Sequence, residues 1–142
     1  MSDHSHPEPT VGILILNPKG KVFLVRSHKW DNLFTVPGGH IELGEKAEDA
    51  VKREAKEETN LDVYDIQFLM QTEGIFDSTY YKKKHFIFLI HSCKTNSKEV
   101  KLNKESEEYT WATIPEAFRL PLTSYTKKII EEYKKKLEEK KN

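Results

Sequence analysis

The sequence has little cysteine, no long apolar run and no excess of charge of either sign. Cys93 is the single cysteine among 142 residues, so an intrachain disulfide is excluded and a reducing compartment is favoured. The longest apolar stretch near the start, Val11 to Leu16, is too short to span a bilayer and has no basic flank of the kind typical of a signal peptide. We therefore expect a cytoplasmic protein with no membrane partner.

Charge and length narrow the class of protein further. The 23 basic and 23 acidic residues cancel, so no overall field attracts nucleic acid, and a small molecule is the expected partner. A chain of 142 residues with 37% apolar and 32% charged residues suits one domain. We expect a monomer or homodimer in which residues 1–9, a polar segment with histidines and prolines, form a flexible arm and residues 10–142 form a single domain.

The order of apolar runs, turns and helical stripes predicts an α/β protein. Strands are expected at 10–16 and 21–26, joined as a β-hairpin by Asn17-Pro-Lys-Gly20, and later at 61–70, 85–91 and 109–112. Residues 27–33 are expected to form a polar loop, and Val36-Pro-Gly-Gly39 to interrupt regular structure. Helices are expected at 46–59, briefly from Pro115, and at 124–140. This order predicts a mixed β-sheet packed between helices.

The helix expected at 46–59 carries acidic residues on its apolar side. On a helical wheel, Glu54, Glu57 and Glu58 fall among the alanines expected to pack, whereas Arg53 falls on the side expected to face water. Carboxylates on a packed face are costly unless they are paired or coordinate a metal. Their oxygens can converge, because the residues are one turn apart or adjacent, and Mg²⁺ is their natural partner. A solvated acidic edge of the helix is the alternative interpretation.

The same segment resembles the Nudix box, which is a glycine, five residues, a glutamate, seven residues and then R-E-U-x-E-E-x-G-U, with U a bulky aliphatic residue. The required positions are occupied by Gly39, Glu45, Arg53, Glu54, Glu57, Glu58 and Leu61. Two residues depart from the pattern: Ala55 is small where a bulky residue is expected, and Asn60 replaces the final glycine. Asparagine tolerates the left-handed conformation that ends a helix, so we expect Asn60 to serve as the cap.

The resemblance implies a Nudix-type α/β/α sandwich and a Mg²⁺-dependent pyrophosphohydrolase, with Mn²⁺ as an alternative cofactor. It implies that the metal ligands are Glu54, Glu57 and Glu58, with the Gly39 carbonyl as an additional one. Arg53 would orient the carboxylates, and Glu45 would pair with Arg53 or cap the turn.

The general base remains open between a helix glutamate and a glutamate of the later acidic segment Glu105 to Trp111. Glu54 and Glu57 are the helix candidates. In the later segment Glu105 is favoured, as base or additional metal ligand, over Glu107 and Glu108.

Residues near the expected site suggest how a substrate binds. Candidate phosphate ligands are Arg26, at the end of the second expected strand, and His28 and Lys29 beyond it; with Lys82 to Lys84 these cations would suit three or more phosphates. Candidates for stacking on a base are Trp30, Phe34, Tyr80 and Tyr81. Ordinary surface and packing roles are the alternatives.

The substrate class follows from two weaker resemblances. The segment 100–117 resembles the matching part of diadenosine-tetraphosphate hydrolases, whereas Pro-Gly-Gly before the box is shared with house-cleaning nucleoside triphosphatases. We expect a nucleoside triphosphate or a dinucleoside polyphosphate as substrate. The alternatives are an ADP-ribose or nucleotide-sugar hydrolase, a non-catalytic nucleotide-binding module, and an isopentenyl-diphosphate-type isomerase.

Overall fold

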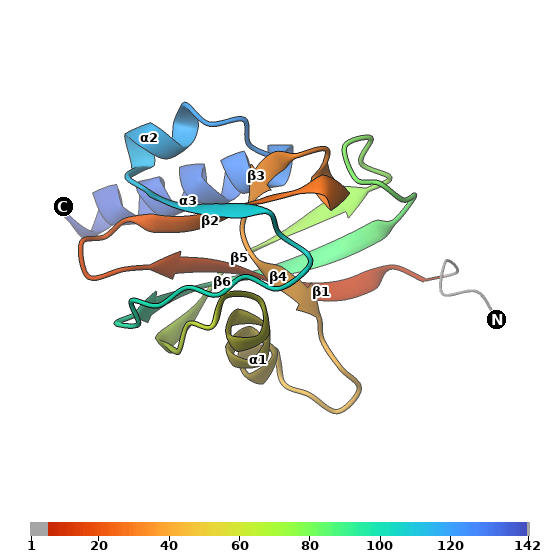
Figure 1. The fold of residues 1–142 in the computed structure, drawn as a ribbon, viewed down its shortest axis with the longest axis horizontal. Helices are drawn as coiled ribbons and strands as arrows, with labels where there is room; N and C mark the ends of the chain where they lie inside the picture. The colour runs from red at the N-terminus through yellow and green to blue at the C-terminus, as the bar shows by residue number, and fades with distance from the viewer. Residues whose placement is uncertain (1–5, 142) are drawn as a thin grey trace.

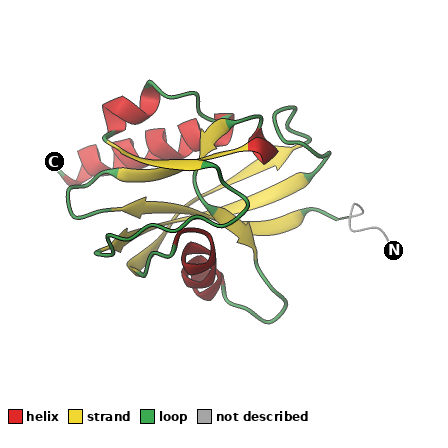
Figure 2. Ribbon diagram, in the orientation of Figure 1, coloured by secondary structure: helices red, strands yellow, loops and turns green. Residues whose placement is uncertain are grey.

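In the computed structural model, which describes residues 6–141, a seven-stranded mixed sheet lies between helices on both faces (Figures 1 and 2). The strands are β1 (Glu8–Leu16), β2 (Val22–Ser27), β3 (Leu33–Thr35), β4 (Gly38–His40), β5 (Val63–Ile75), β6 (His85–Thr95) and β7 (Glu108–Ala112). Helix α1 (Ala47–Thr59) covers one face, and α2 (Ile114–Phe118) and α3 (Ser124–Lys140) cover the other. The predicted α/β/α sandwich is confirmed.

The sheet divides at β1 and β2, and this division creates the space for a site. The main strand order is β3-β2-β1-β6-β5, with β4 paired to β1 and β7 paired to β2. β1 runs parallel to β6, and the other pairs are antiparallel. The predicted hairpin is present, but β1 and β2 pair only at Leu16 and Val22, next to the turn. Farther from the turn each strand pairs with a different neighbour, so the two strands separate.

Two hydrophobic clusters hold the three layers together. Alternate residues of β1 face opposite sides of the sheet, so Ile13 and Ile15 pack toward α1 whereas Leu14 and Leu16 pack toward α3. The continuous apolar run in β1 is therefore explained by burial on both faces. Ile129 and Ile130 of α3 are fully buried, as the predicted apolar stripe requires.

The structure differs from the expected elements in several places; β5 and β6 extend beyond their expected ends, to Ile75 and Thr95. β1 begins at Glu8, since residues 8 and 9 pair with β6, so these two residues belong to the sheet and not to an arm; residues 1–5 of that arm lie outside the described residues. Gly38 to His40 form a strand, because β1 offers a free edge there. The expected loop after β2 contains a short 3-10 helix, η2 (His28–Trp30), with Trp30 buried. Within residues 6–141, no helix is long and apolar enough to cross a membrane.

Asn60 ends α1 in the left-handed conformation, as the sequence predicts. Its φ and ψ are 68° and 9°, and its backbone N–H donates to the Lys56 carbonyl. The side-chain Nδ2 donates to the Glu99 carbonyl at 3.0 Å.

We expect Asn60→Gly to be neutral or slightly stabilising, because glycine adopts this conformation without strain and this offsets the lost side-chain hydrogen bond. Asn60→Val should lose about 1–2 kcal/mol, because a β-branched residue is strained at positive φ. Thermal denaturation of both variants measures the difference. Equal melting temperatures for the two would show that the conformation of this cap does not limit stability.

Candidate functional site

A cavity of about 270 Å³ lies where β1 and β2 separate. Its walls come from these two strands, β3, β4, β6, η2, α1 and α3, and from the loops that hold Pro37, Glu42, Tyr80 and Glu105. One part of the lining is acidic and consists of Glu42, Glu54, Glu58 and Glu105. Another part is aromatic and consists of Trp30, Tyr80, Phe86, Phe88 and Tyr125. The cavity therefore joins a region suited to a cation with a region suited to a planar ring.

Helix α1 carries two carboxyl groups into the protein interior. The Glu58 carboxyl is buried, and its Oε2 accepts a hydrogen bond from the Gly38 amide at 2.9 Å. Burial raises the pKa of Glu58 well above its usual value, and contact with the Glu105 carboxyl and the charge of Glu54 add to this effect. Burial also raises the pKa of Glu54, against the opposing effect of Arg53. Both side chains therefore occupy positions where a bound cation would relieve an electrostatic cost.

Glu57 and Arg53 differ from the helical-wheel prediction. The Glu57 side chain is 56% exposed and lies 3.3 Å from the Arg53 Nη1, so it does not point into the packed face. Arg53, expected to face water, is only 24% exposed because its guanidinium turns back toward the acidic groups. Among residues 6–141, no three acidic, histidine or cysteine side chains are grouped closely enough to hold a metal ion. The expected convergence of Glu54, Glu57 and Glu58 is thus absent from this arrangement of side chains.

Arg53 of α1 links the loop at the start of the box, which holds His40 and Glu45, to the helix. Its Nε and Nη2 bind the two Glu45 carboxylate oxygens at 2.8 and 2.9 Å, its Nη1 binds Glu54 at 2.7 Å, and Nη2 also donates to the His40 carbonyl at 3.0 Å. The predicted pairing of Glu45 with Arg53 is confirmed. These hydrogen bonds lower the pKa of Glu45 to about 2 and raise the pKa of Arg53. The fork geometry of arginine thereby sets the direction of the Glu54 carboxylate.

The polar groups of β4 alternate between β1 and the acidic region. The Pro37 carbonyl accepts from the Ile13 N–H of β1, and the Ile41 N–H donates to the Pro9 carbonyl of β1. In an antiparallel ladder such bonds recur at every second residue, so the Gly39 carbonyl, midway between them and opposite Val11, points toward β1. Gly38 lies between these bonded positions, and its amide donates to Glu58. Of the two glycines, Gly38 therefore faces the acidic region with its backbone polar groups, although Gly39 was expected to do so.

Gly39 is needed for a different reason, which is a close approach of backbone to side chain. A Cβ atom at this position would lie 2.4 Å from Glu54 Cδ and 2.5 Å from both carboxylate oxygens. Any larger residue would displace the Glu54 carboxylate. The box glycine therefore leaves room for the buried glutamate.

Of the three candidate glutamates in the later segment, only Glu105 lines the cavity. Burial would raise its pKa, but a hydrogen bond from Lys29 and contact with Glu58 lower it below its usual value, so Glu105 is the ionised member of the pair. Glu107 and Glu108 instead form ion pairs with residues of β2 and η2.

The three predicted phosphate ligands are paired with this acidic segment. Arg26 lies 3.3 Å from Glu107 and 2.5 Å from Glu108, and His28 Nδ1 lies 3.4 Å from Glu107. Lys29 lies 2.9 Å from Glu105 and is the one of the three that lines the cavity. Arg26 and His28 do not line the cavity, and their ion pairs hold the acidic segment against the sheet.

The aromatic region contains one of the two predicted tyrosines and several residues that sequence reasoning missed. Tyr80 lines the cavity with its ring centroid 4.4 Å from that of Trp30, whereas Tyr81 is exposed and outside the lining. Phe88 and Tyr125 stack at 4.3 Å. Tyr125 lies in α3, and its hydroxyl contacts Thr35 Oγ1. The two residues are 90 positions apart, so the sequence around either one does not predict the contact.

Comparison with known proteins agrees with this arrangement. The family model described as NUDIX domain matches residues 6–133. The nucleoside triphosphatase NudI of Escherichia coli K12 is 29% identical over 103 residues, which are 68% of this chain and 73% of NudI. The RNA pyrophosphohydrolase of Caulobacter vibrioides is 36% identical over 74 residues, 51% of this chain and 42% of that enzyme. The crystal structure of a MutT protein from Methanosarcina mazei Go1 has a TM-score of 0.76 and 24% identity, covering 93% of this chain and 96% of that one. With the box in place and the family model matched over most of its length, the chain belongs to the NUDIX family of hydrolases, which act on pyrophosphate bonds.

Proposed function

We propose that this protein is a Mg²⁺-dependent pyrophosphohydrolase acting on a nucleoside polyphosphate, either a nucleoside triphosphate or a dinucleoside polyphosphate. The observation that carries the proposal is the shared cavity, in which Glu54, Glu58 and Glu105 lie in the same space as Trp30 and Tyr80. A nucleotide needs both regions, because its phosphates require cations and its base offers a flat ring for stacking. The cavity volume of about 270 Å³ is at the small end for a ligand pocket, so part of such a substrate would extend beyond the cavity.

The donor groups fit a hard divalent cation. Glu54 and Glu58 supply carboxylate oxygens from α1, Glu105 supplies another from its loop, and the Gly38 backbone faces the same region. Oxygen ligands of this kind suit Mg²⁺, and Mn²⁺ accepts the same set. The buried Glu58 carboxyl next to Glu105 supports this assignment, because a bound cation would favour the ionised form of Glu58 that burial disfavours. Glu57 completes the proposed set only after its side chain rotates away from Arg53.

The chemistry divides between the cation and the protein. When bound, the cation neutralises the diphosphate oxygens that would otherwise repel a nucleophile. Arg53 holds the Glu54 carboxylate in one direction through its hydrogen bond at 2.7 Å. Glu105 or a helix glutamate accepts the proton of the attacking water. We favour Glu105 because it borders the cavity from a loop opposite the helix glutamates, which leaves Glu54 and Glu58 for the cation.

The relationship to the nucleoside triphosphatase NudI, at 29% identity over 73% of that protein, supports a triphosphate substrate. The cationic residues Lys82 to Lys84 support a triphosphate substrate less than the sequence indicated, because each already has a partner. Lys84 is 16% exposed and paired with Glu8, and Lys82 and Lys83 lie over the exposed rings of Tyr81 and Phe76.

We expect kcat/KM for nucleoside triphosphates or dinucleoside polyphosphates to exceed that for ADP-ribose and nucleotide sugars by about tenfold or more, since these substrates carry more phosphate charge for the cation site. A panel of all four classes with Mg²⁺ measures this preference. The same panel with EDTA should show no turnover. A preference for ADP-ribose or a nucleotide sugar would contradict the substrate class, and binding without products would favour a non-catalytic nucleotide-binding module.

A further inference from the structure

Lys29 lies in the cavity but already has a partner there. Its Nζ is 2.9 Å from Glu105 Oε1, and its side chain is 29% exposed. Attraction to Glu105 raises the pKa of Lys29 against the effect of partial burial, so the ammonium group stays charged. Among residues 6–141, Lys29 is the basic residue that forms an ion pair with Glu105. This contact occupies one of the three N–H donors of the ammonium group and sets its direction toward Glu105.

The backbone of Glu105 is held on both sides of its side chain. Its N–H donates to Asn103 Oδ1 at 3.0 Å, and its carbonyl accepts from Ser27 Oγ at 3.0 Å. The same Ser27 Oγ accepts from the Lys29 N–H at 3.2 Å, so one hydroxyl links the loop of Glu105 to η2. With the backbone fixed, the remaining freedom of Glu105 is in its side-chain torsions, and Lys29 holds the end of that side chain.

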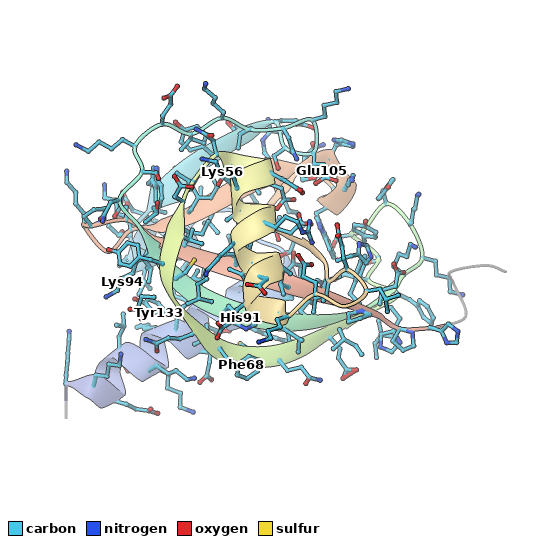
Figure 3. All side chains as sticks on the ribbon, turned by 90° about the horizontal axis from the view of Figure 1, so that it is seen from below. Lys56, Phe68, His91, Lys94, Glu105 and Tyr133 are labelled. Atoms are coloured by element: carbon cyan, nitrogen blue, oxygen red, sulfur yellow. The ribbon has the colours of Figure 1, made fainter. Side chains whose placement is uncertain are left out.

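Glu105 is held beside a second carboxyl group although its side chain is partly open to solvent. Its carboxyl contacts that of Glu58, which is bonded to the Gly38 amide. The Glu105 side chain is 46% exposed, so without a charged partner it would be free to turn toward solvent. Figure 3 shows Glu105 beside the end of α1 that carries Lys56, near the last turns of the helix. The ion pair with Lys29 opposes this turn and keeps the Glu105 carboxylate at the cavity.

We propose that Lys29 is a positioning residue that holds the Glu105 carboxylate beside Glu58, and not a residue that binds substrate phosphate. This inference rests on the proposed function, because Glu105 must take part in hydrolysis for its position to matter. It separates Lys29 from Arg26 and His28, which hold the same loop through Glu107 without lining the cavity.

A double-mutant cycle of Lys29→Met and Glu105→Gln tests the proposal. Lys29→Met should lower kcat about tenfold with KM for the nucleotide unchanged, as is typical when the partner of a reacting group is lost. In the Glu105→Gln background, Lys29→Met should cause no further loss, since there is no carboxylate left to hold. Lys29→Arg keeps the charge and should retain more activity than Lys29→Met.

A second readout needs no substrate. In EDTA, Lys29→Met should lower the melting temperature by about 2 °C in the wild-type background and not at all with Glu105→Gln. If Lys29→Met does not fold, Lys29→Gln replaces it in both cycles. Lys104→Met is the matched control, because it removes a charge from an exposed neighbour of Glu105 and should change neither kcat nor KM.

The proposal is overturned if Lys29→Met raises KM with kcat unchanged, if its effect multiplies with that of Glu105→Gln, or if it behaves like the wild type. The cycle uses whichever panel substrate the wild type hydrolyses, so an incorrect substrate class leaves the cycle valid. A wild type that hydrolyses none of the panel contradicts the proposed function instead, and the coupling of melting temperatures in EDTA then decides the ion-pair proposal alone.

Discussion

Glu58→Gln should lower kcat by about 100-fold or more while the protein remains folded. The substitution removes a negative charge from the buried position where α1 faces the Gly38 amide, and this charge is what a cation needs. Glutamine has nearly the same shape, and its amide oxygen still accepts the Gly38 hydrogen bond at that position. The loss therefore reports on charge at the site and not on packing. Steady-state kinetics at saturating Mg²⁺ measures it.

The same variant should be more stable than the wild type when metal is removed. In EDTA we expect its melting temperature to rise by about 3 °C, because glutamine is neutral without the proton that the buried Glu58 carboxyl must take up beside Glu54 and Glu105. Added Mg²⁺ should stabilise the wild type more than Glu58→Gln, as binding linkage requires. Glu57→Gln should also lose turnover but keep its melting temperature in EDTA, since Glu57 is exposed.

Glu48→Gln is the matched control for these variants. Glu48 lies in the first turn of α1, exposed, and outside the cavity lining. It should keep wild-type kcat. Near-wild-type turnover by Glu58→Gln at saturating Mg²⁺ would show that Glu58 is not a ligand.

Arg53→Lys should lower kcat by about 100-fold, even though it preserves charge. Arginine reaches Glu45, Glu54 and the His40 carbonyl at once through its planar fork, whereas the single ammonium of lysine cannot satisfy all three. The Glu54 carboxylate then loses its fixed direction, and losses of 10–100-fold are typical when such a supporting group is removed. We expect the larger value because Arg53 also holds the box loop to α1.

Measuring both melting temperature and kcat for Arg53→Lys shows whether Arg53 positions the Glu54 carboxylate or only stabilises the fold. The melting temperature should fall by about 3 °C, since the contacts are partly exposed and each contributes little. Arg119→Lys, an exposed position at the end of α2, is the control and should change neither quantity. If Arg53→Lys kept wild-type kcat despite a lower melting temperature, Arg53 would be a stabilising residue without influence on the reacting groups.

Local sequence was sufficient to predict the elements that depend on short-range patterns. The helix 124–140 has the predicted bounds, and α1 begins one residue after the predicted start. Both depend on apolar residues that recur every three to four positions, a signal contained within the helix itself. Asn60 was predictable for the same reason, because the end of a helix requires a residue that tolerates positive φ. The family also follows from local spacing, since the box residues lie within one segment of the chain.

Tertiary structure decided which of these side chains meet. A helical wheel places Glu57 and Arg53 by angle alone, but a long side chain turns toward the charges that the fold brings near. Arg53 therefore reaches back to Glu45, and the exposed Glu57 carboxylate lies beside the Arg53 guanidinium. Tyr125 enters the cavity because α3 packs against Thr35, 90 residues earlier.

The pairing of Lys29 with Glu105 likewise joins residues 76 positions apart. The sequence alone determined the family, most of the strands and helices, and the acidic residues available for metal binding. Which of those residues face the cavity, and which cations are already neutralised, depended on long-range packing and charge, which no local pattern records.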